Sequence, residues 1–142
     1  MTMPIGAVEF FLTRREAQYL DDILRIFAIQ EIHATLATTK LTEPERVSNL
    51  YTFMQCNTTL ANVFRNVQEK GGAVWMSIQW IEHVTNGIGM ANPENMSREV
   101  KLEHHQLAQT LLERLQPRLT LVEGLVNRWE ESPLTTKSKN WD

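Results

Sequence analysis

The chain of 142 residues has the composition of an ordinary soluble globular protein, with 42% hydrophobic and 22% charged residues. Its formal net charge of −3 gives no strong field that would attract nucleic acid or an anionic membrane. The single cysteine, Cys56, excludes an internal disulfide framework, and no apolar run reaches the roughly eighteen residues that a membrane helix needs. We expect one domain over 1–142, without membrane insertion. We also expect a cytoplasmic location, in the cell or in a host, because the first residues lack the pattern of a signal peptide.

The first third of the chain predicts an arm followed by a long helix. Residues 1–12 are apolar but interrupted by Pro4 and Gly6, which favours a short packed N-terminal arm over a helix. Thr13-Arg-Arg-Glu16 then has the form of a capping box, in which a hydroxyl and a carboxylate satisfy two free backbone donors. Apolar residues recur at helical spacing after it, so we expect an amphipathic helix over about 13–38.

A second helix is predicted over about 43–70. Thr42-Glu-Pro-Glu45 forms another capping box, and Gly71-Gly72 suits a left-handed cap at the other end. Asn57 occupies the one polar position in a seam with alternating spacings of three and four. A buried asparagine in such a seam can fix register and oligomeric state. The alternative is that Asn57 lies at a solvated edge of an ordinary globular core, and both interpretations stay open. The apolar seam positions are Leu50, Phe53, Leu60, Phe64 and Val67.

The most apolar stretch lies between the glycine pair and Asn86-Gly87. The segment from Ala73 to Val84 carries two tryptophans and one formal charge, Glu82. A helix that is apolar nearly all round is usually buried among other elements, so we expect a central helix over about 73–86. A buried strand is the alternative, because short apolar runs rich in valine, isoleucine and tryptophan fit both structures.

The last predicted helix is the longest. Asn92-Pro93-Glu94 favours a helix start, with Ser97 as a rival cap. The three-four apolar spacing continues without a phase shift through Pro117, which predicts a helix over about 93–131, either kinked there or divided into two stacked helices. Residues 132–142 form a polar tail. These elements together predict an all-α fold, a bundle of about four helices.

No motif in the sequence identifies a reaction. Glu103-His104-His105 places two imidazoles side by side, but neighbouring residues on a helix point about 100° apart and do not readily share one metal ion. Cys56 falls in the middle of a predicted helix with no base near it in the sequence, as is common for a structural cysteine. We therefore expect no catalytic residues, no metal and no cofactor.

The sequence leaves two other binding functions as alternatives. A nucleic-acid-binding regulator would need a contiguous basic stripe, for instance from Arg46, Arg65 and Lys70, but most basic residues alternate with acidic ones. We regard nucleic acid as an unlikely partner. A small-molecule-binding bundle would need an apolar pocket of a few hundred Å³ beside Trp75 and Trp80.

The feature that favours one function is a scarcity of charge. From Val47 to Pro93 the only formal charges are Arg65, Glu69, Lys70 and Glu82. Surfaces depleted in charge, with aromatic residues and methionine nearby, resemble the cores of protein interfaces. We therefore predict a non-enzymatic protein–protein interaction module, such as an adaptor, chaperone, inhibitor or assembly component, that binds another protein, itself, or both. The candidate interface residues are Tyr51, Gln55, Asn57, Asn62, Trp75, Met76, Trp80 and, in the polar tail, Trp141.

Overall fold

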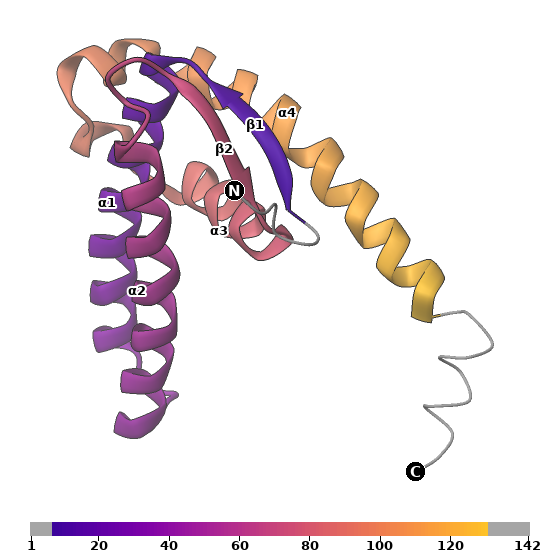
Figure 1. Ribbon diagram of the computed structural model, residues 1–142. Helices are drawn as coiled ribbons and strands as arrows, with labels where there is room; N and C mark the ends of the chain where they lie inside the picture. Colours follow the sequence, from indigo (N-terminus) through magenta and orange to yellow (C-terminus); the bar gives the residue numbers. More distant parts are fainter. Residues whose placement is uncertain (1–6, 131–142) are drawn as a thin grey trace.

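The structure, a computed structural model, describes the backbone of residues 7–130 and the side chains of residues 7–119. Four helices and a small two-stranded antiparallel sheet make up these residues, and the sheet lies at the outside of the helices (Figure 1). This confirms the predicted all-α bundle of about four helices. The elements in chain order are β1 (Val8–Leu12), α1 (Arg14–Ala37), α2 (Glu43–Arg65), β2 (Gly72–Met76), α3 (Ile78–Met90), a single 3₁₀ turn η1 (Pro93–Asn95) and α4 (Arg98–Glu130).

Helix α1 begins where the capping box predicts. The backbone N–H of Glu16 donates to Thr13 Oγ1 at 3.1 Å, and the backbone N–H of Thr13 donates to Glu16 Oε1 at 2.8 Å. These reciprocal bonds satisfy two donors that the first turn leaves without a helical partner. The bounds of α1 agree with the predicted 13–38 to within one residue.

The predicted central helix is wrong over residues 73–76, which form strand β2. They pair antiparallel with β1, so that Phe10 lies opposite Val74 and Val8 opposite Met76. Burial alternates along β2, with Val74 and Met76 buried. Helix α3 starts only after Ser77, whose hydroxyl accepts the Trp80 backbone N–H at 3.3 Å. The apolar run is therefore a strand followed by a capped helix, and the second half of the predicted N-terminal arm is the partner strand.

Helix α2 ends at Arg65, five residues before the predicted end, and hydrogen-bonded turns follow it. Gly71 closes these turns with a φ of 73°, and its N–H donates to the Val67 carbonyl at 2.7 Å. A Cβ atom at Gly71 would lie 2.7 Å from the Leu12 carbonyl oxygen. The glycine is therefore left-handed, as expected, and it also lets the chain pass close to the end of β1.

The predicted fourth helix divides at its start and is continuous afterwards. The Asn92 side chain caps only η1, and α4 begins at Arg98, next to the rival cap Ser97. From there α4 runs as one helix through Pro117 to Glu130. Residues 1–6 of the predicted arm and the predicted tail with Trp141 lie outside the described residues.

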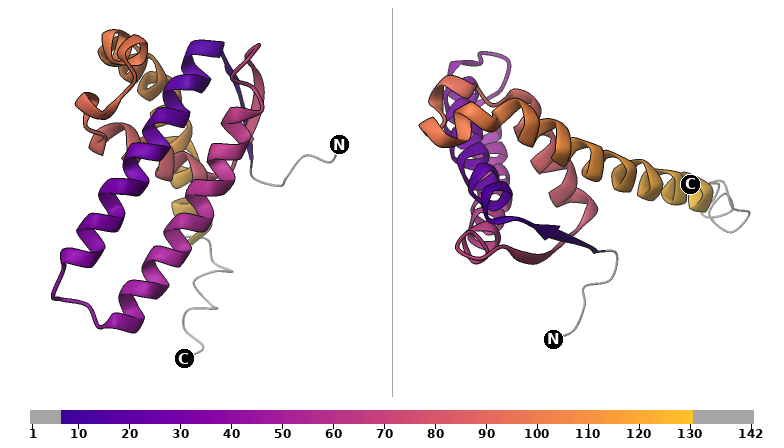
Figure 2. Two further views of the ribbon diagram at one scale, coloured as in Figure 1. Left: turned by 90° about the vertical axis from the view of Figure 1, so that its left-hand side faces the viewer. Right: turned by 90° about the horizontal axis from the view of Figure 1, so that it is seen from above.

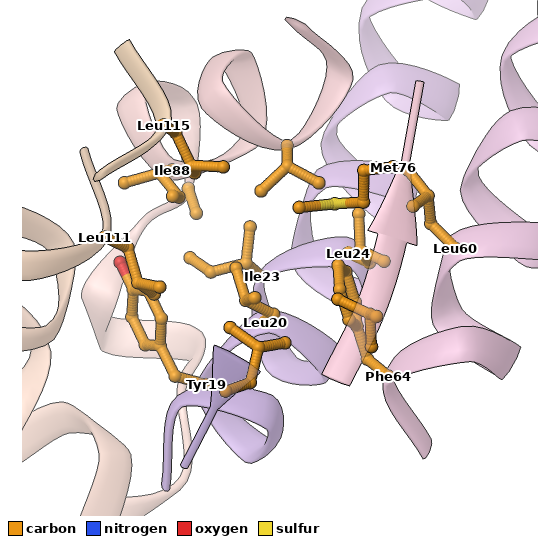
Figure 3. Packing of buried hydrophobic residues seen from close by; sticks show 14 of the residues in the cluster. Tyr19, Leu20, Ile23, Leu24, Leu60, Phe64, Met76, Ile88, Leu111 and Leu115 are labelled. Carbon is orange, nitrogen blue, oxygen red and sulfur yellow. The ribbon is translucent and has the colours of Figure 1, made fainter. Parts of the chain in front are cut away.

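One hydrophobic core joins all four helices and the sheet (Figure 3). Its centre is made by α1, which presents a buried side chain on nearly every turn from Tyr19 to Phe27. Gly87 lets α3 approach α1 closely, since a Cβ atom there would lie 3.0 Å from side-chain carbons of both Ile23 and Phe27. The other elements contribute Leu60, Phe64, Met76, Ile88, Leu111 and Leu115, which Figure 3 shows around α1.

Candidate protein-interaction surface

Helices α1 and α2 form an antiparallel hairpin, and one half of it extends beyond the core (Figures 1 and 2). In α1 the buried residues end at Phe27 except for Thr35, and in α2 they begin only at Asn57. The outer half, residues 28–56, is paired mainly along its own two helices. It also contacts α3 and the loop after it, where Gln30 bonds Met90 and Asn92 and where Phe53 packs against His83. We call this segment the hairpin arm.

The hairpin arm carries an unusual share of exposed apolar side chains. Of the seven large hydrophobic residues that are exposed in the described part of the chain, four lie on it. Val47 and Tyr51 of α2 are 62% and 64% exposed, and Ile29 and Leu36 of α1 are 53% and 63% exposed. Single exposed apolar residues are common, but a group on one projecting element is typical of an interaction site.

Helical geometry places these apolar residues on one side of the arm. The Nε of Arg65 bonds Asp21 Oδ1 at 3.1 Å, so the two residues mark the side that α1 and α2 share. Leu36 lies fifteen residues after Asp21, and Val47 eighteen before Arg65, which are about four and five helical turns. They therefore project on the same side as the ion pair. We call this the arm face: Ile29, Ile32, Leu36, Val47, Tyr51 and Met54.

The polar residues of α2 around the arm face are exposed and uncharged, including the predicted Gln55 and Asn62. The Gln55 amide nitrogen donates to the Tyr51 hydroxyl at 2.9 Å, and the hydroxyls of Thr52 and Thr59 donate to carbonyls of their own helix. Because these groups already have partners, covering them costs less free energy than covering unpaired polar groups or charges.

Two hollows follow one another along α2 and share Tyr51. The first, of about 660 Å³, has Tyr51, Met54, Gln55, Cys56, Thr58 and Thr59 among its described lining residues. The second, of about 560 Å³, has Glu43, Pro44, Val47, Ser48 and Tyr51. Both are open depressions rather than enclosed cavities. Their shape suits side chains projecting from another protein better than an engulfed small ligand.

Asn57 is buried in the interior of the protein and does not lie on the arm face. It is 4% exposed, and its amide nitrogen donates to the Leu24 carbonyl at 3.0 Å. Its oxygen lies 2.8 Å from His83 Nε2, so it accepts the imidazole proton. His83 also packs against the rings of Phe27 and Phe53. This polar group joins α1, α2 and α3, and burial lowers the pKa of His83 from its usual value.

The remaining candidate interface residues differ in how deeply they are buried. Met76 is 1% exposed and belongs to the core, and Trp80 is half-buried against it. Trp75 is half-buried on β2, in the strand pair with Glu9. Trp75 and Trp80 line neither hollow on α2. The structure thus brings together Tyr51, Gln55 and Asn62 on the exposed side of α2, and places the others elsewhere.

His83, His104 and Cys56 contact other residues of the chain in ways that indicate structural roles. Tyr19 Oη lies 3.1 Å from His104 Nδ1, within hydrogen-bond distance, and burial raises the pKa of Tyr19 above its usual range. Burial also raises the pKa of the Cys56 thiol, which disfavours the nucleophilic thiolate. Within residues 7–119, no three histidine, cysteine or carboxylate side chains are arranged to hold a metal ion.

Two of the basic residues that a nucleic-acid site would use have protein partners. Arg65 pairs with Asp21, and Arg46 Nη1 donates to the Thr38 carbonyl at 3.2 Å across the hairpin turn. Lys70 is exposed beside Glu69 in the turns after α2. These side chains are engaged in holding the hairpin or lie beside an acid, an arrangement unlike a basic stripe.

Sequence reasoning missed Val47 and the two large apolar residues that are exposed on α1, Ile29 and Leu36. A signal for part of this set exists in the sequence. Beginning at Pro44, a second series of positions follows α2 at spacings of three and four, about 100° around the helix from the buried seam. The series comprises Pro44, Val47, Tyr51, Met54, Thr58, Ala61 and Arg65.

Comparisons with protein-family models, with curated proteins and with solved structures found no match to this chain. In the described part of the chain, no helix has both the length and the apolarity that crossing a membrane requires.

Proposed function

We propose that this chain is a non-enzymatic protein–protein interaction module whose binding site is the arm face. The observation that carries the proposal is that, over most of its length, the outer side of α2 is exposed to solvent and yet carries no charged residues. From Val47 to Phe64 the helix has no formal charge, yet its outer side presents Val47 and Tyr51 to solvent. A helix side that is merely solvated usually carries charged residues.

The distribution of stability also supports this function. The core orders the inner halves of α1 and α2. The capping box of Thr13 orders the start of α1, and the Thr42 hydroxyl, which accepts the Glu45 backbone N–H, orders the start of α2. A pre-ordered helical hairpin loses little conformational entropy on binding, so more of the contact energy appears as affinity. The single cysteine fits a cytoplasmic setting, which we include in the proposal.

The nucleic-acid and small-molecule functions have weaker support. The first lacks a basic stripe among the described residues, because Arg46 and Arg65 bond protein groups. For the second, Trp75 and Trp80 are half-buried against the sheet and the core, away from the two open hollows on α2.

Site-specific photo-crosslinking tests the proposal. A photoreactive phenylalanine analogue replaces Tyr51 in the full chain, and the matched control carries it at Gln106, an exposed residue of α4. We expect irradiation in the producing cells to give discrete protein adducts from position 51, to a second copy or to another protein, and none from position 106. Equal or absent adducts from both positions would contradict an interaction site on the arm face.

A further inference from the structure

We propose that the arm face binds a second copy of this chain, with the two α2 helices antiparallel across a two-fold axis near Met54. The inference rests on the proposed interaction function and names its partner. In this arrangement the two hairpin arms complete one four-helix bundle, so that each covers the apolar side chains of the other. Helix pairs with one apolar side reach a stable packing in such bundles.

The spacing of α2 gives the first argument. The second series of positions, from Pro44 to Arg65, alternates steps of three and four over six intervals. This is the repeat by which one helix packs along another at a small crossing angle. The buried seam of the same helix already packs inside the chain. The second series lies beside this seam and is available to another helix, although Ala61 is partly buried against the core.

Side-chain sizes are complementary in the antiparallel register. With Met54 on the axis, each α2 residue faces an α2 residue of the second copy, and the two residue numbers add up to about 108. Tyr51 then faces Thr58 of the second copy, and Val47 faces Ala61 of the second copy. A large residue meets a small one in both layers, which is how facing positions interdigitate.

The charges at the two ends of α2 are complementary in the same register. Glu43 and Glu45 lie in the first turn and Arg65 in the last, with an uncharged stretch from Val47 to Phe64 between them. Antiparallel packing sets Glu43 beside Arg65 of the second copy at both ends of the contact. Asp21 engages only the Nε of Arg65, and a guanidinium has further donors for another carboxylate. Parallel packing would instead oppose like charges.

Disulfide trapping and native mass test the register. In a Cys56→Ala background, mild oxidation should link copies that carry Met54→Cys, because position 54 meets itself on the axis. Val47→Cys alone should stay unlinked, whereas Val47→Cys combined with Ala61→Cys should link. By light scattering after size exclusion, the unmodified chain should be a dimer, Tyr51→Glu a monomer, and the control Gln106→Glu a dimer, all with unchanged helical circular dichroism.

The outcomes separate this inference from the proposed function. A monomeric unmodified chain at every concentration, or a dimer unaffected by Tyr51→Glu, overturns the two-fold contact. Linking of Val47→Cys alone, or failure of Met54→Cys to link, overturns the antiparallel register. If photo-crosslinking at position 51 then captures only a different protein, the interaction function stands and the second copy is excluded. If it captures nothing, both fail.

Discussion

The orientation of the buried Asn57 amide determines which ring nitrogen of neutral His83 carries the proton. The Asn57 nitrogen must donate to the Leu24 carbonyl, which leaves only the Asn57 oxygen to face His83. His83 Nε2 therefore carries a proton, and in the neutral imidazole Nδ1 does not. The ring is surrounded by Phe27 and Phe53, with which it makes close contacts, so adding a second proton there is unfavourable.

Stability should therefore fall on mild acidification. Burial lowers the pKa of His83, and burial with the charge of His105 lowers that of His104. As the pH falls through about 6.5, the unfolded chain binds protons before the folded chain does, so the free energy of unfolding falls, by up to about 1.4 kcal/mol per pH unit for each group. Above that pH the stabilisation is complete. Urea unfolding between pH 7.5 and 5.5, followed by circular dichroism, measures the slope.

The variant His83→Gln measures how much of this pH dependence of the free energy of unfolding is due to His83. Glutamine keeps an N–H donor for Asn57 but does not titrate, so the slope should be shallower than in the wild type. The control His33→Gln removes an exposed imidazole on α1 in place of the buried one. An unchanged slope in His83→Gln would show that His83 does not contribute to it.

At the scale of elements, the contact between α1 and α3 depends on a missing side chain. A Cβ at Gly87 would lie 3.0 Å from Ile23 Cγ2 and Phe27 Cδ2, whereas one at Gly89 meets nothing within 4 Å. Gly87→Ala should thus push α3 from α1 and lower the free energy of unfolding by about 1–3 kcal/mol. Gly89→Ala should raise it by up to about 1 kcal/mol through helix propensity. Chemical denaturation of both variants measures the difference, and a shift of the same sign in both would contradict the close packing.

The helices and strands differ in how well the sequence could predict them. The starts of α1 and α2 could be predicted because Thr13 and Thr42 act through residues only three positions away. Strand β2 could not, because its four apolar residues fit a helix equally well and its partner β1 lies some sixty residues earlier. In the candidate site, the scarcity of charge selected Tyr51, Gln55 and Asn62, and the structure places all three on the exposed side of α2. The sequence could not locate Asn57, whose environment is set by α1 and α3 together.

At the scale of the whole molecule, one arginine connects the beginning of the described chain to its last helix. Arg114 of α4 pairs with Glu16 through Nη1 at 2.7 Å, and its Nη2 donates to the Phe11 carbonyl at the end of β1. Glu16 is 5% exposed and also caps α1. The contact therefore holds β1, α1 and α4 together on the side of the core opposite to the projecting end of the arm (Figure 1).

Removing Arg114 should lower the free energy of unfolding more than removing an arginine from an exposed ion pair. Arg114→Gln leaves the buried Glu16 carboxylate without its cation, and we expect a loss of about 2 kcal/mol, below the usual 3–5 because Arg114 is 34% exposed. Arg25→Gln, which removes an exposed pair with Asp22, should cost under about 1 kcal/mol. Because Glu16 and Arg114 act as a unit, Glu16→Gln together with Arg114→Gln should cost less than the sum of the single changes. Additive losses in urea unfolding would show that the two side chains contribute independently.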